Sequence, residues 1–371
     1  MKISAIDVIP VGIPYTHDAP AGSDPDRALM CAVYVKVGTD AGLTGWGEVF
    51  GFGAASCAMS EAAFRLMVTP LALGRQADDI DALMTELFRR TQGSSLKGPV
   101  RNALGALDIA LWDIKGQAAG APIWRLLGGD GARRRIPAYA SLLRTGHPDH
   151  VASLCISARD RGYRAIKLHE RNDEAIAAVA RARESVGSDI ELMLDANCTW
   201  LPDEVAAKAR ALLPFGLKWL EEPIYPPDDF AALARLRRDT GIAVAAGENL
   251  GTLQEFARMI DAAAVDYIQP DVSKFGGISE MMKAAQMAEA RGIPFMPHSP
   301  LFGPVLIATL HILAALKGDA ICEHYYCDLA ESPMGDWAIP KAGAFDVPDG
   351  PGLGVVVDEG VLARYRQPVS A

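Results

Sequence analysis

Residues 164–197 read RAIKLHERNDEAIAAVARARESVGSDIELMLDAN. This stretch begins and ends with short apolar segments that have the composition of β-strands, and the residues between them have a helical pattern. A strand, a helix and a second strand in this order predict a βαβ unit with parallel strands. Both strand-like segments end in polar residues, Lys167 and His169 in the first and Asp195 and Asn197 in the second.

The same alternation continues on both sides of this stretch. Helical segments separate eight strand-like segments, which are IPAYAS (136–141), RAIKLH (164–169), IELMLDAN (190–197), LKWLEEP (217–223), IAVAAGEN (242–249), VDYIQPD (265–271), IPFMPH (293–298) and DAICEH (319–324). Eight such alternations predict a parallel sheet, and eight is the number of strands that closes a TIM-type barrel. We therefore expect an α/β protein whose main domain is a (β/α)8 barrel.

The residues before the barrel have a different pattern, typical of an α+β domain. Strand composition is found at residues 3–11, 32–37 and 43–48. The turn Thr39-Asp40-Ala41-Gly42 separates the last two, which should pair as a hairpin. Helical patterns follow, the longest of them at residues 100–120.

These patterns divide the chain into three parts. We predict an α+β capping domain at residues 1–130, the barrel at residues 131–338, and a C-terminal segment at residues 339–371 that returns to the capping domain and completes it. A chain of 371 residues is long enough for a barrel of roughly 250 residues and a second domain.

The composition argues against several classes of protein. A formal net charge of -10 is the opposite of what a nucleic-acid-binding protein needs, and no apolar run reaches membrane-spanning length. The six cysteines are scattered without a CxxC pair, so reduced thiols are expected rather than a disulfide framework. We expect a cytoplasmic enzyme that binds neither nucleic acid nor a membrane.

Three of the strand-end residues are carboxylates on neighbouring strands, the third to the fifth: Asp195, Glu221 and Glu248. The carboxyl ends of barrel strands converge on one mouth, so residues that are 26 and 27 positions apart in sequence should meet there. Three carboxylates close together repel one another unless a cation neutralises them. Oxygen ligands without thiolate or imidazole favour Mg²⁺, and the sequence therefore predicts a magnesium site.

Ionisable groups are expected on both sides of this site. Lys167 and His169 are two residues apart on one strand and should share a face. Asp271 and His298 end the sixth and seventh strands, and a carboxylate beside an imidazole is typical of an acid/base pair. Glu323 ends the eighth strand, and it could donate a hydrogen bond to a substrate carboxylate if burial kept it protonated.

The chain resembles the mandelate racemase subgroup of the enolase superfamily over nearly its full length. The residues that carry the resemblance are ALDIALWDIKG (106–116), LLGG (126–129), Lys167-Leu168-His169, LDAN (194–197), WLEEP (219–223), GEN (247–249), PDVSKFGG (270–277), MPHS (296–299), Glu323 and PDGPGLG (348–354). The resemblance implies a capping domain over a barrel, loops near residues 15–28 and 48–57 that shape specificity, and assembly into a homo-oligomer.

The resemblance also implies roles for individual residues. One Mg²⁺ ion per subunit would be held by Asp195, Glu221 and Glu248. Asp271 and His298 would form the acid/base dyad, Glu323 would donate toward the intermediate, and Lys167 would lie near the substrate carboxylate and the metal. His169 takes the position where the family usually has a second lysine, which makes simple two-base racemisation a weaker expectation. Asn197, Ser141 and Tyr139 are candidates for contact with the substrate.

These parts predict removal of the proton α to a carboxylate through a metal-stabilised enediolate. The preferred reaction is dehydration of a sugar acid to a 2-keto-3-deoxy acid. Racemisation or epimerisation of a 2-hydroxy acid is the alternative, because both faces have a candidate base. Two more distant possibilities are Schiff-base aldolase chemistry at Lys167 and a barrel that binds acids without turnover.

Overall fold

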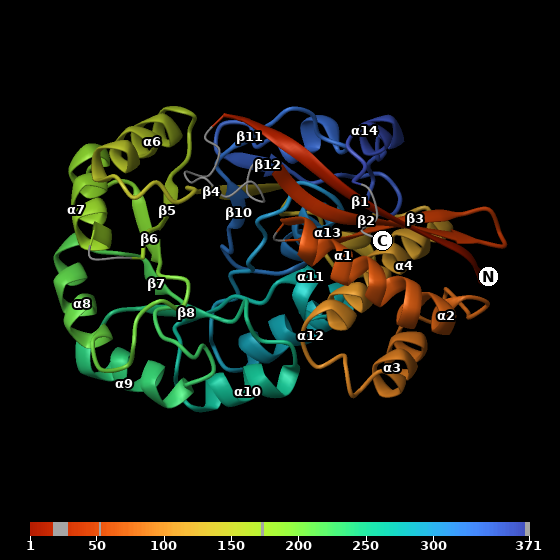
Figure 1. The fold of residues 1–371 in the computed structure, drawn as a ribbon, viewed down its shortest axis with the longest axis horizontal. Coiled ribbons are helices and arrows are strands. Elements are labelled where there is room, and N and C mark those ends of the chain that lie inside the picture. Colours follow the sequence, from red (N-terminus) through yellow and green to blue (C-terminus); the bar gives the residue numbers. More distant parts are fainter. Residues whose placement is uncertain (18–28, 52, 172–173, 368–371) are drawn as a thin grey trace.

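The computed structural model describes residues 1–17, 29–51, 53–171 and 174–367. Two sheets organise these residues, an antiparallel sheet and a parallel sheet that curls into a barrel. In Figure 1 the antiparallel sheet and helices α1 to α4 lie on one side of the molecule, and helices α6 to α9 cover the far side of the barrel.

The antiparallel sheet has the strand order β11-β1-β2-β3. Its strands are β1 (Ile3–His17), β2 (Leu29–Thr39), β3 (Thr44–Gly51) and the short β11 (Asp328–Leu329). The predicted hairpin is confirmed, because β2 and β3 pair along their length. The Thr39 amide donates to the Leu43 carbonyl at 2.9 Å to close the turn, and Gly42 there has a φ of 79°, which favours glycine.

Helices α1 (Gly53–Ala63) and α4 (Pro99–Ala119) pack against this sheet. The π-helix η2 (Phe64–Val68), α3 (Ile80–Arg90) and α5 (Ile123–Leu126) contact α4, and α2 (Thr69–Ala72) contacts η2 and α3. The long helix predicted at residues 100–120 is α4, which begins at a proline and ends before Gly120 in the left-handed conformation. It lies so close to β3 that a Cβ atom on Gly47 would be 1.9 Å from the Ala106 carbonyl oxygen.

Among the described residues, seven parallel strands form the barrel in the order β10-β4-β5-β6-β7-β8-β9. They are β4 (Arg135–Ser141), β5 (Ala165–His169), β6 (Glu191–Asp195), β7 (Trp219–Glu221), β8 (Val244–Ala246), β9 (Tyr267–Ile268) and β10 (Cys322–Tyr325). The helices around them are α6 (Pro148–Asp160), α7 (Glu174–Val186), α8 (Val205–Leu212), the 3-10 helix η3 (Leu213–Phe215), α9 (Phe230–Thr240), α10 (Leu253–Asp261), α11 (Val272–Phe275), α12 (Gly277–Ala290) and α13 (Pro304–Ala315).

The expected seventh barrel strand at residues 293–298 is not a regular strand. Two isolated parallel bridges, Ile268 with Phe295 and Asp271 with His298, join this segment to the chain at and after β9. Pro294 and Pro297 lie in it, and a proline has no N–H to donate to a strand ladder. The segment still runs parallel to β9, so His298 reaches the same mouth as the other strand ends.

The C-terminal residues contact both sheets. Strand β12 (Ala344–Asp346) follows the 3-10 helix η4 (Gly335–Ala338) and pairs antiparallel with β4, and helix α14 (Glu359–Arg364) comes last. The Gly12 amide donates to the Tyr365 carbonyl at 3.0 Å, so the end of the described chain lies beside β1. The boundaries predicted for the capping domain, the barrel and the C-terminal segment stay a prediction.

Helix α4 also joins the N-terminal region to the barrel. The Arg101 guanidinium donates to the Phe275 carbonyl at 2.7 Å, at the end of α11. The Trp112 indole donates to the Ser279 hydroxyl of α12 at 2.9 Å. These bonds fix α11, which follows Asp271, against a long buried helix.

In the two segments that the resemblance assigns to specificity loops, the described residues belong to strands and a helix. Residues 18–28 and 52 lie outside the described residues. Residues 15–17 belong to β1, residues 48–51 to β3 and residues 53–57 to α1. The second segment is therefore the end of a strand followed closely by a helix.

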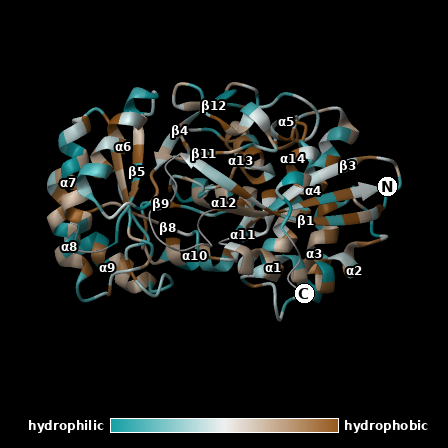
Figure 2. Cartoon of the chain, turned by 45° about the horizontal axis from the view of Figure 1, so that its top comes forward, coloured by the Kyte–Doolittle hydropathy of each residue, from teal (hydrophilic) through white to brown (hydrophobic). Residues whose placement is uncertain are grey.

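Hydrophobic residues concentrate in the interior (Figure 2). Helix α13 is the most apolar of the barrel helices and is buried along nearly its whole length. Across the parts of the chain that the structure describes, no helix combines the length and apolar character needed to cross a bilayer. All six cysteines lie within the described residues, and none of them forms a disulfide bond.

His311 on α13 has a structural role. Its Nδ1 accepts from the Trp124 amide at 3.3 Å, and its Nε2–H donates to the Leu353 carbonyl at 3.0 Å. Burial lowers the pKa of His311 to about 4, because the protonated ring would be desolvated and would present a hydrogen to the Trp124 amide.

This low pKa predicts a pH-dependent stability. Below about pH 6.5, His311 binds a proton in the unfolded chain but not in the folded protein. The contribution of His311 to the free energy of unfolding is therefore complete above pH 6.5 and is lost as the pH falls toward 4. His311→Gln keeps a donor and an acceptor but does not titrate. Between pH 7 and pH 5, urea unfolding should show the wild type losing about 2 kcal/mol more than this variant. Parallel pH profiles for the two proteins would contradict the assignment.

Candidate active site

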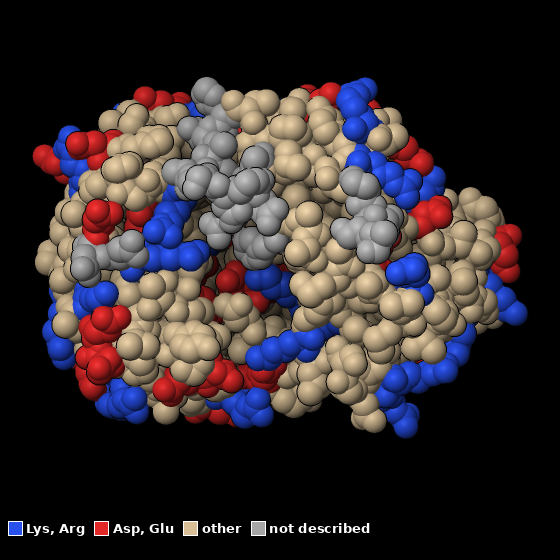
Figure 3. All heavy atoms as spheres, in the orientation of Figure 1, with Lys and Arg blue, Asp and Glu red and all other residues tan. Residues whose placement is uncertain are grey.

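The polar strand ends meet at one mouth of the barrel, next to the N-terminal region. In register, His169 lies opposite Asp195 on the neighbouring strand, and Asp195 lies opposite Glu221 on the next. Figure 3 shows a hollow between the barrel and the N-terminal region in which acidic and basic side chains gather. The strand ends on which the sequence prediction rested are therefore brought together.

Lys167 lies at the centre of the cluster and is fully buried. Its ammonium is 2.6 Å from Glu221 Oε1, 2.9 Å from Glu323 Oε1 and 4.0 Å from Asp195 Oδ2. Burial alone would lower the pKa of Lys167, but the negative charges of Glu221 and Glu323 outweigh it and hold the pKa well above its usual value. A lysine held in its charged form is a poor amine nucleophile, which argues against Schiff-base chemistry.

This arrangement predicts the outcome of a trapping experiment. Treating the protein with pyruvate and borohydride should leave its mass unchanged, because a protonated Lys167 cannot form the imine that borohydride reduces. Mass spectrometry measures the result directly. An adduct formed by the wild type and absent from Lys167→Met would overturn this interpretation.

His169 contacts the carboxylate of the next strand. Its Nε2 is 3.1 Å from Asp195 Oδ2, and its Nδ1–H donates to the Leu142 carbonyl at 2.7 Å. Burial lowers the pKa of His169, but the hydrogen bond with Asp195 and the charge of Asp195 raise it further, so the net shift is upward. The sequence predicted a shared face with Lys167, and both side chains do reach Asp195.

Asp271 and His298 form a hydrogen-bonded pair. His298 Nδ1 is 2.5 Å from Asp271 Oδ2, and the other oxygen of Asp271 accepts from the Ser273 amide at 2.7 Å and the Ser273 hydroxyl at 2.6 Å. These bonds outweigh burial and lower the pKa of Asp271. Asp271 therefore stays ionised and fixes the orientation of the imidazole.

The second ring nitrogen of His298 faces the carboxylates. Its Nε2 is 2.5 Å from Glu248 Oε2, and the same Glu248 oxygen is 3.4 Å from the Lys274 ammonium. Burial lowers the pKa of His298, but attraction to Glu248 and Glu323 outweighs it and raises the pKa to about 10 in this arrangement. A divalent ion that bound Glu248 would remove much of that attraction.

Glu323 differs from the expectation. Burial raises its pKa, as predicted, but the charges of Lys167 and His298 and the Ser141 hydroxyl at 2.7 Å outweigh burial and lower the pKa to about 2. The Ser299 amide donates to its other oxygen at 3.0 Å. The predicted protonated donor is therefore wrong for this arrangement, because the sequence did not reveal that Lys167 points at Glu323.

The three candidate substrate-contacting residues have different surroundings. Ser141 is buried, and its hydroxyl donates a hydrogen bond to Glu323. The Tyr139 hydroxyl is buried without a hydrogen-bond partner, with the Lys167 ammonium 5.5 Å from the ring centroid. Asn197 donates through its amide at 2.7 Å and through its side chain at 2.5 Å to Asp195, so it orients that carboxylate. Arg171 in turn donates to the Asn197 side-chain oxygen at 2.6 Å.

Two residues of the site had been given no role from the sequence, although both lie in quoted motifs. Glu222 follows Glu221 in WLEEP, has a φ of 40°, and accepts from the Gly247 amide at 2.9 Å. Burial and the nearby Glu248 raise the pKa of Glu222 to about 8. Lys274 lies in PDVSKFGG and contacts Glu248. No spacing rule identified them, because they depend on local turns after the strand ends.

The residues present fit a hard divalent cation by their chemistry. Asp195, Glu221 and Glu248 supply oxygen atoms from three adjacent strand ends, the donor type that Mg²⁺ prefers. Within the described ranges, no three His, Cys, Asp or Glu side chains form a ready coordination shell, because Lys167, His169 and His298 hold the carboxylates instead.

The charges at the mouth also favour a cation. Lys167 and Lys274, with His169 and His298 if both rings are protonated, are outnumbered by five carboxylates: Asp195, Glu221, Glu248, Asp271 and Glu323. Glu222 is not counted because its pKa is raised to about 8. Buried carboxylates without a balancing charge are costly. A divalent ion would offset this excess of negative charge.

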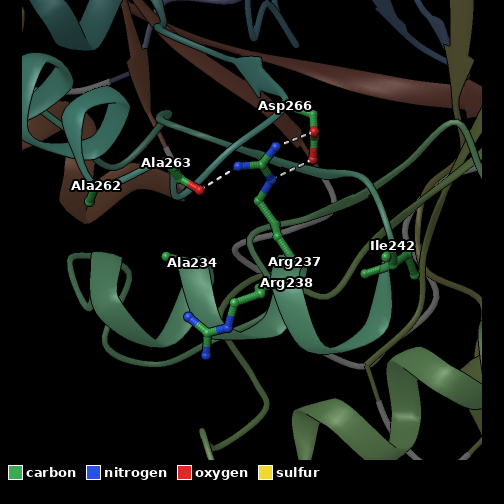
Figure 4. Close-up of a pocket in the computed structure, with 8 residues that line it drawn as sticks. Ala234, Arg237, Arg238, Ile242, Ala262, Ala263 and Asp266 are labelled. Atoms are coloured by element: carbon green, nitrogen blue, oxygen red, sulfur yellow. Dashed lines mark hydrogen bonds and ion pairs between the residues drawn. The ribbon is translucent and has the colours of Figure 1, made fainter.

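A second depression lies at the opposite end of the barrel, between the C-terminal ends of α9 and α10 (Figure 4). Its lining residues are Ala234, Arg237, Arg238, Gly241, Ile242, Ala262, Ala263 and Asp266. Arg237 spans it and donates at 2.7 Å to Asp266, which also accepts from the Val244 amide at 2.8 Å. This depression is a structural junction at the start of β8, far from the convergent strand ends.

This fold and this cluster define the class of the protein. Residues 150–361 match the family model described as "Enolase C-terminal domain-like", and residues 27–128 match "Mandelate racemase / muconate lactonizing enzyme, N-terminal domain". The chain belongs to the mandelate racemase and muconate lactonizing enzyme family of the enolase superfamily, as its motifs predicted.

Two of the relatives have names that describe enzymes acting on sugar acids, and a third is named a racemase. The chain is 36% identical over 299 residues to the 3,6-anhydro-alpha-L-galactonate cycloisomerase of Streptomyces coelicolor, covering 79% of this chain and 80% of that one. It is 31% identical to the arabinonate dehydratase of Saccharolobus solfataricus, with 96% of each covered. A racemase from Streptomyces coelicolor A3(2), solved with bound magnesium, superposes with a TM-score of 0.84 at 29% identity, covering 98% of this chain and 100% of that one.

Proposed function

We propose that this protein is a Mg²⁺-dependent acid-sugar dehydratase that removes the proton α to a carboxylate and expels the β-hydroxyl, leaving a 2-keto-3-deoxy acid. The observation that carries the proposal is the pair of Asp271 and His298 at 2.5 Å, with the second ring nitrogen of His298 turned toward the carboxylate cluster. The dehydratase named among the relatives supports this reaction.

Asp195, Glu221 and Glu248 are the proposed ligands of one Mg²⁺ ion per chain. A magnesium-bound relative supports the choice of metal. When bound, Mg²⁺ would neutralise the substrate carboxylate and stabilise the negative charge that develops when the α-proton leaves. Asn197 would keep Asp195 oriented through its two hydrogen bonds.

His298 is the proposed base and acid. Asp271 holds its Nδ1–H, so Nε2 is the nitrogen that takes the α-proton and then returns it to the departing hydroxyl. The C–H and C–O bonds break, water leaves, and the enol becomes a ketone. Lys167 would supply a fixed positive charge near the substrate carboxylate. Glu323, Ser141 and Tyr139 would lie next to Lys167.

A racemase or epimerase is the second candidate. His169 supports it, because this imidazole lies at the neighbouring strand end and reaches Asp195 at 3.1 Å. An elimination that opens a ring is a variant of the main proposal: if the β-oxygen is tethered, the same steps give an isomer rather than loss of water. The cycloisomerase among the relatives favours this variant.

The test is a screen of mono- and diacid sugars and their anhydro forms with the purified protein and Mg²⁺ in deuterated water. Formation of a keto acid supports dehydration or ring opening, and the mass of the product separates the two. Exchange of the α-proton with an intact skeleton would replace the proposal with an epimerase. Neither signal with any acid would overturn it.

We further propose that the enzyme works in the cytoplasm as a homo-oligomer. Six cysteines that form no disulfide bond are compatible with a reducing compartment. Several large apolar side chains of the N-terminal region are exposed, including Met59, Leu66 and Leu96, and burial against a second copy would remove them from water. Light scattering of the purified protein tests the assembly.

A further inference from the structure

Lys274 differs from the other lysine of the site. Lys167 is completely buried and lies within 3 Å of two carboxylates, Glu221 and Glu323. The Lys274 side chain is 19% exposed, and its carboxylate contact within the described residues is Glu248 at 3.4 Å. Lys274 is therefore the less buried of these two lysines.

The position of Lys274 is fixed by its surroundings. Its amide donates to Asp271 Oδ1 at 3.2 Å, so the residue is tied to the dyad. Helix α11, which carries it, is held by Arg101 of α4 through the Phe275 carbonyl. The ammonium lies 5.8 Å from the centroid of the Phe50 ring, which belongs to β3. The side chain is thus placed between the N-terminal region and the acid/base pair.

Lys274 and His298 converge on one oxygen atom. Glu248 Oε2 is 2.5 Å from His298 Nε2 and 3.4 Å from Lys274 Nζ. If Glu248 turned toward a metal ion, both donors would lose this oxygen, and the point between them would be open to another oxygen atom. In an elimination, the atom that needs both an acid and a hydrogen-bond donor is the departing oxygen, because negative charge develops on it.

We propose that Lys274 binds the oxygen that leaves from the β-carbon of the substrate, beside His298, and so favours elimination over return of the proton. The inference rests on the proposed function. His298 transfers the proton to this oxygen, while Lys274 stays charged and only donates a hydrogen bond. The substrate is accordingly an acid with a hydroxyl or ring oxygen on the carbon next to the one that loses its proton.

The test uses Lys274→Met and, as a matched control, Lys283→Met, which removes a lysine paired with Glu280 at 2.9 Å on the neighbouring α12. Calorimetry first measures binding of Mg²⁺ alone. The acid that the wild type converts fastest in the screen is then incubated in deuterated water, and keto acid formation is compared with deuterium in recovered substrate.

Lys274→Met should bind Mg²⁺ as well as the wild type or more tightly, because a competitor for Glu248 is gone. Its ratio of keto acid to exchanged substrate should fall by about tenfold or more, in line with the loss of a donor to a developing charge, and Lys274→Arg should recover part of it. Lys283→Met should match the wild type. An unchanged ratio, or loss of Mg²⁺ binding, overturns the inference while the proposed function stands. A wild type that makes no keto acid overturns both.

Discussion

Asp195→Asn is expected to abolish keto acid formation and α-proton exchange together, by about 10³-fold or more. The variant preserves the size of the side chain and one oxygen acceptor for the Asn197 amide, so the fold should persist. It removes one of the three negative charges proposed to hold Mg²⁺, and both reactions need the ion at the same step. Calorimetry with Mg²⁺ should show weakened binding, and circular dichroism should be unchanged.

The control for this variant is Asp261→Asn. Asp261 lies on α10 with its side chain 65% exposed, 3.4 Å from Arg291 and far from the mouth. It should retain full activity and Mg²⁺ binding. Turnover at the wild-type rate in Asp195→Asn would refute the metal assignment.

His298→Asn should lower the rate of proton removal by about 10³-fold, the range expected for loss of a general base. Unlike Asp195→Asn, it should bind Mg²⁺ at least as tightly as the wild type, because His298 Nε2 no longer occupies Glu248 Oε2. The two variants therefore separate loss of the metal from loss of the base. Rates come from α-deuterium incorporation and from keto acid formation on the same samples.

His150→Asn is the matched control, since His150 lies exposed on α6. It should behave as the wild type in both assays. If His298→Asn kept normal proton exchange, the base would have to be another residue, and His169 would be the first to examine.

Much of the fold could be predicted from the sequence, because it depends on patterns that repeat. The alternation of apolar strands and helices identified the barrel, and the strand ends identified Asp195, Glu221, Glu248, Asp271 and His298 as one cluster. Convergence at a barrel mouth is a property of parallel topology, so it did not require knowledge of any side-chain angle. The hairpin was predictable from its turn residues for a similar reason.

Side-chain pairing could not be predicted in the same way. The expected protonated Glu323 was wrong because its pKa depends on Lys167 at 2.9 Å, a contact set by the curvature of the sheet. The seventh strand was less regular than expected because its prolines cannot join a ladder. Lys274 was missed because α11 is only one turn long, and the sequence gives no signal for where its side chains lie.

The central claim is that a divalent ion held by Asp195, Glu221 and Glu248 makes removal of the α-proton possible. Its most direct test follows α-deuterium incorporation into the best acid of the screen by nuclear magnetic resonance, first after exhaustive chelation and then as Mg²⁺ is added back. We predict no incorporation in the chelated protein and recovery that saturates at one Mg²⁺ per chain. Undiminished incorporation after complete removal of divalent ions would contradict the account.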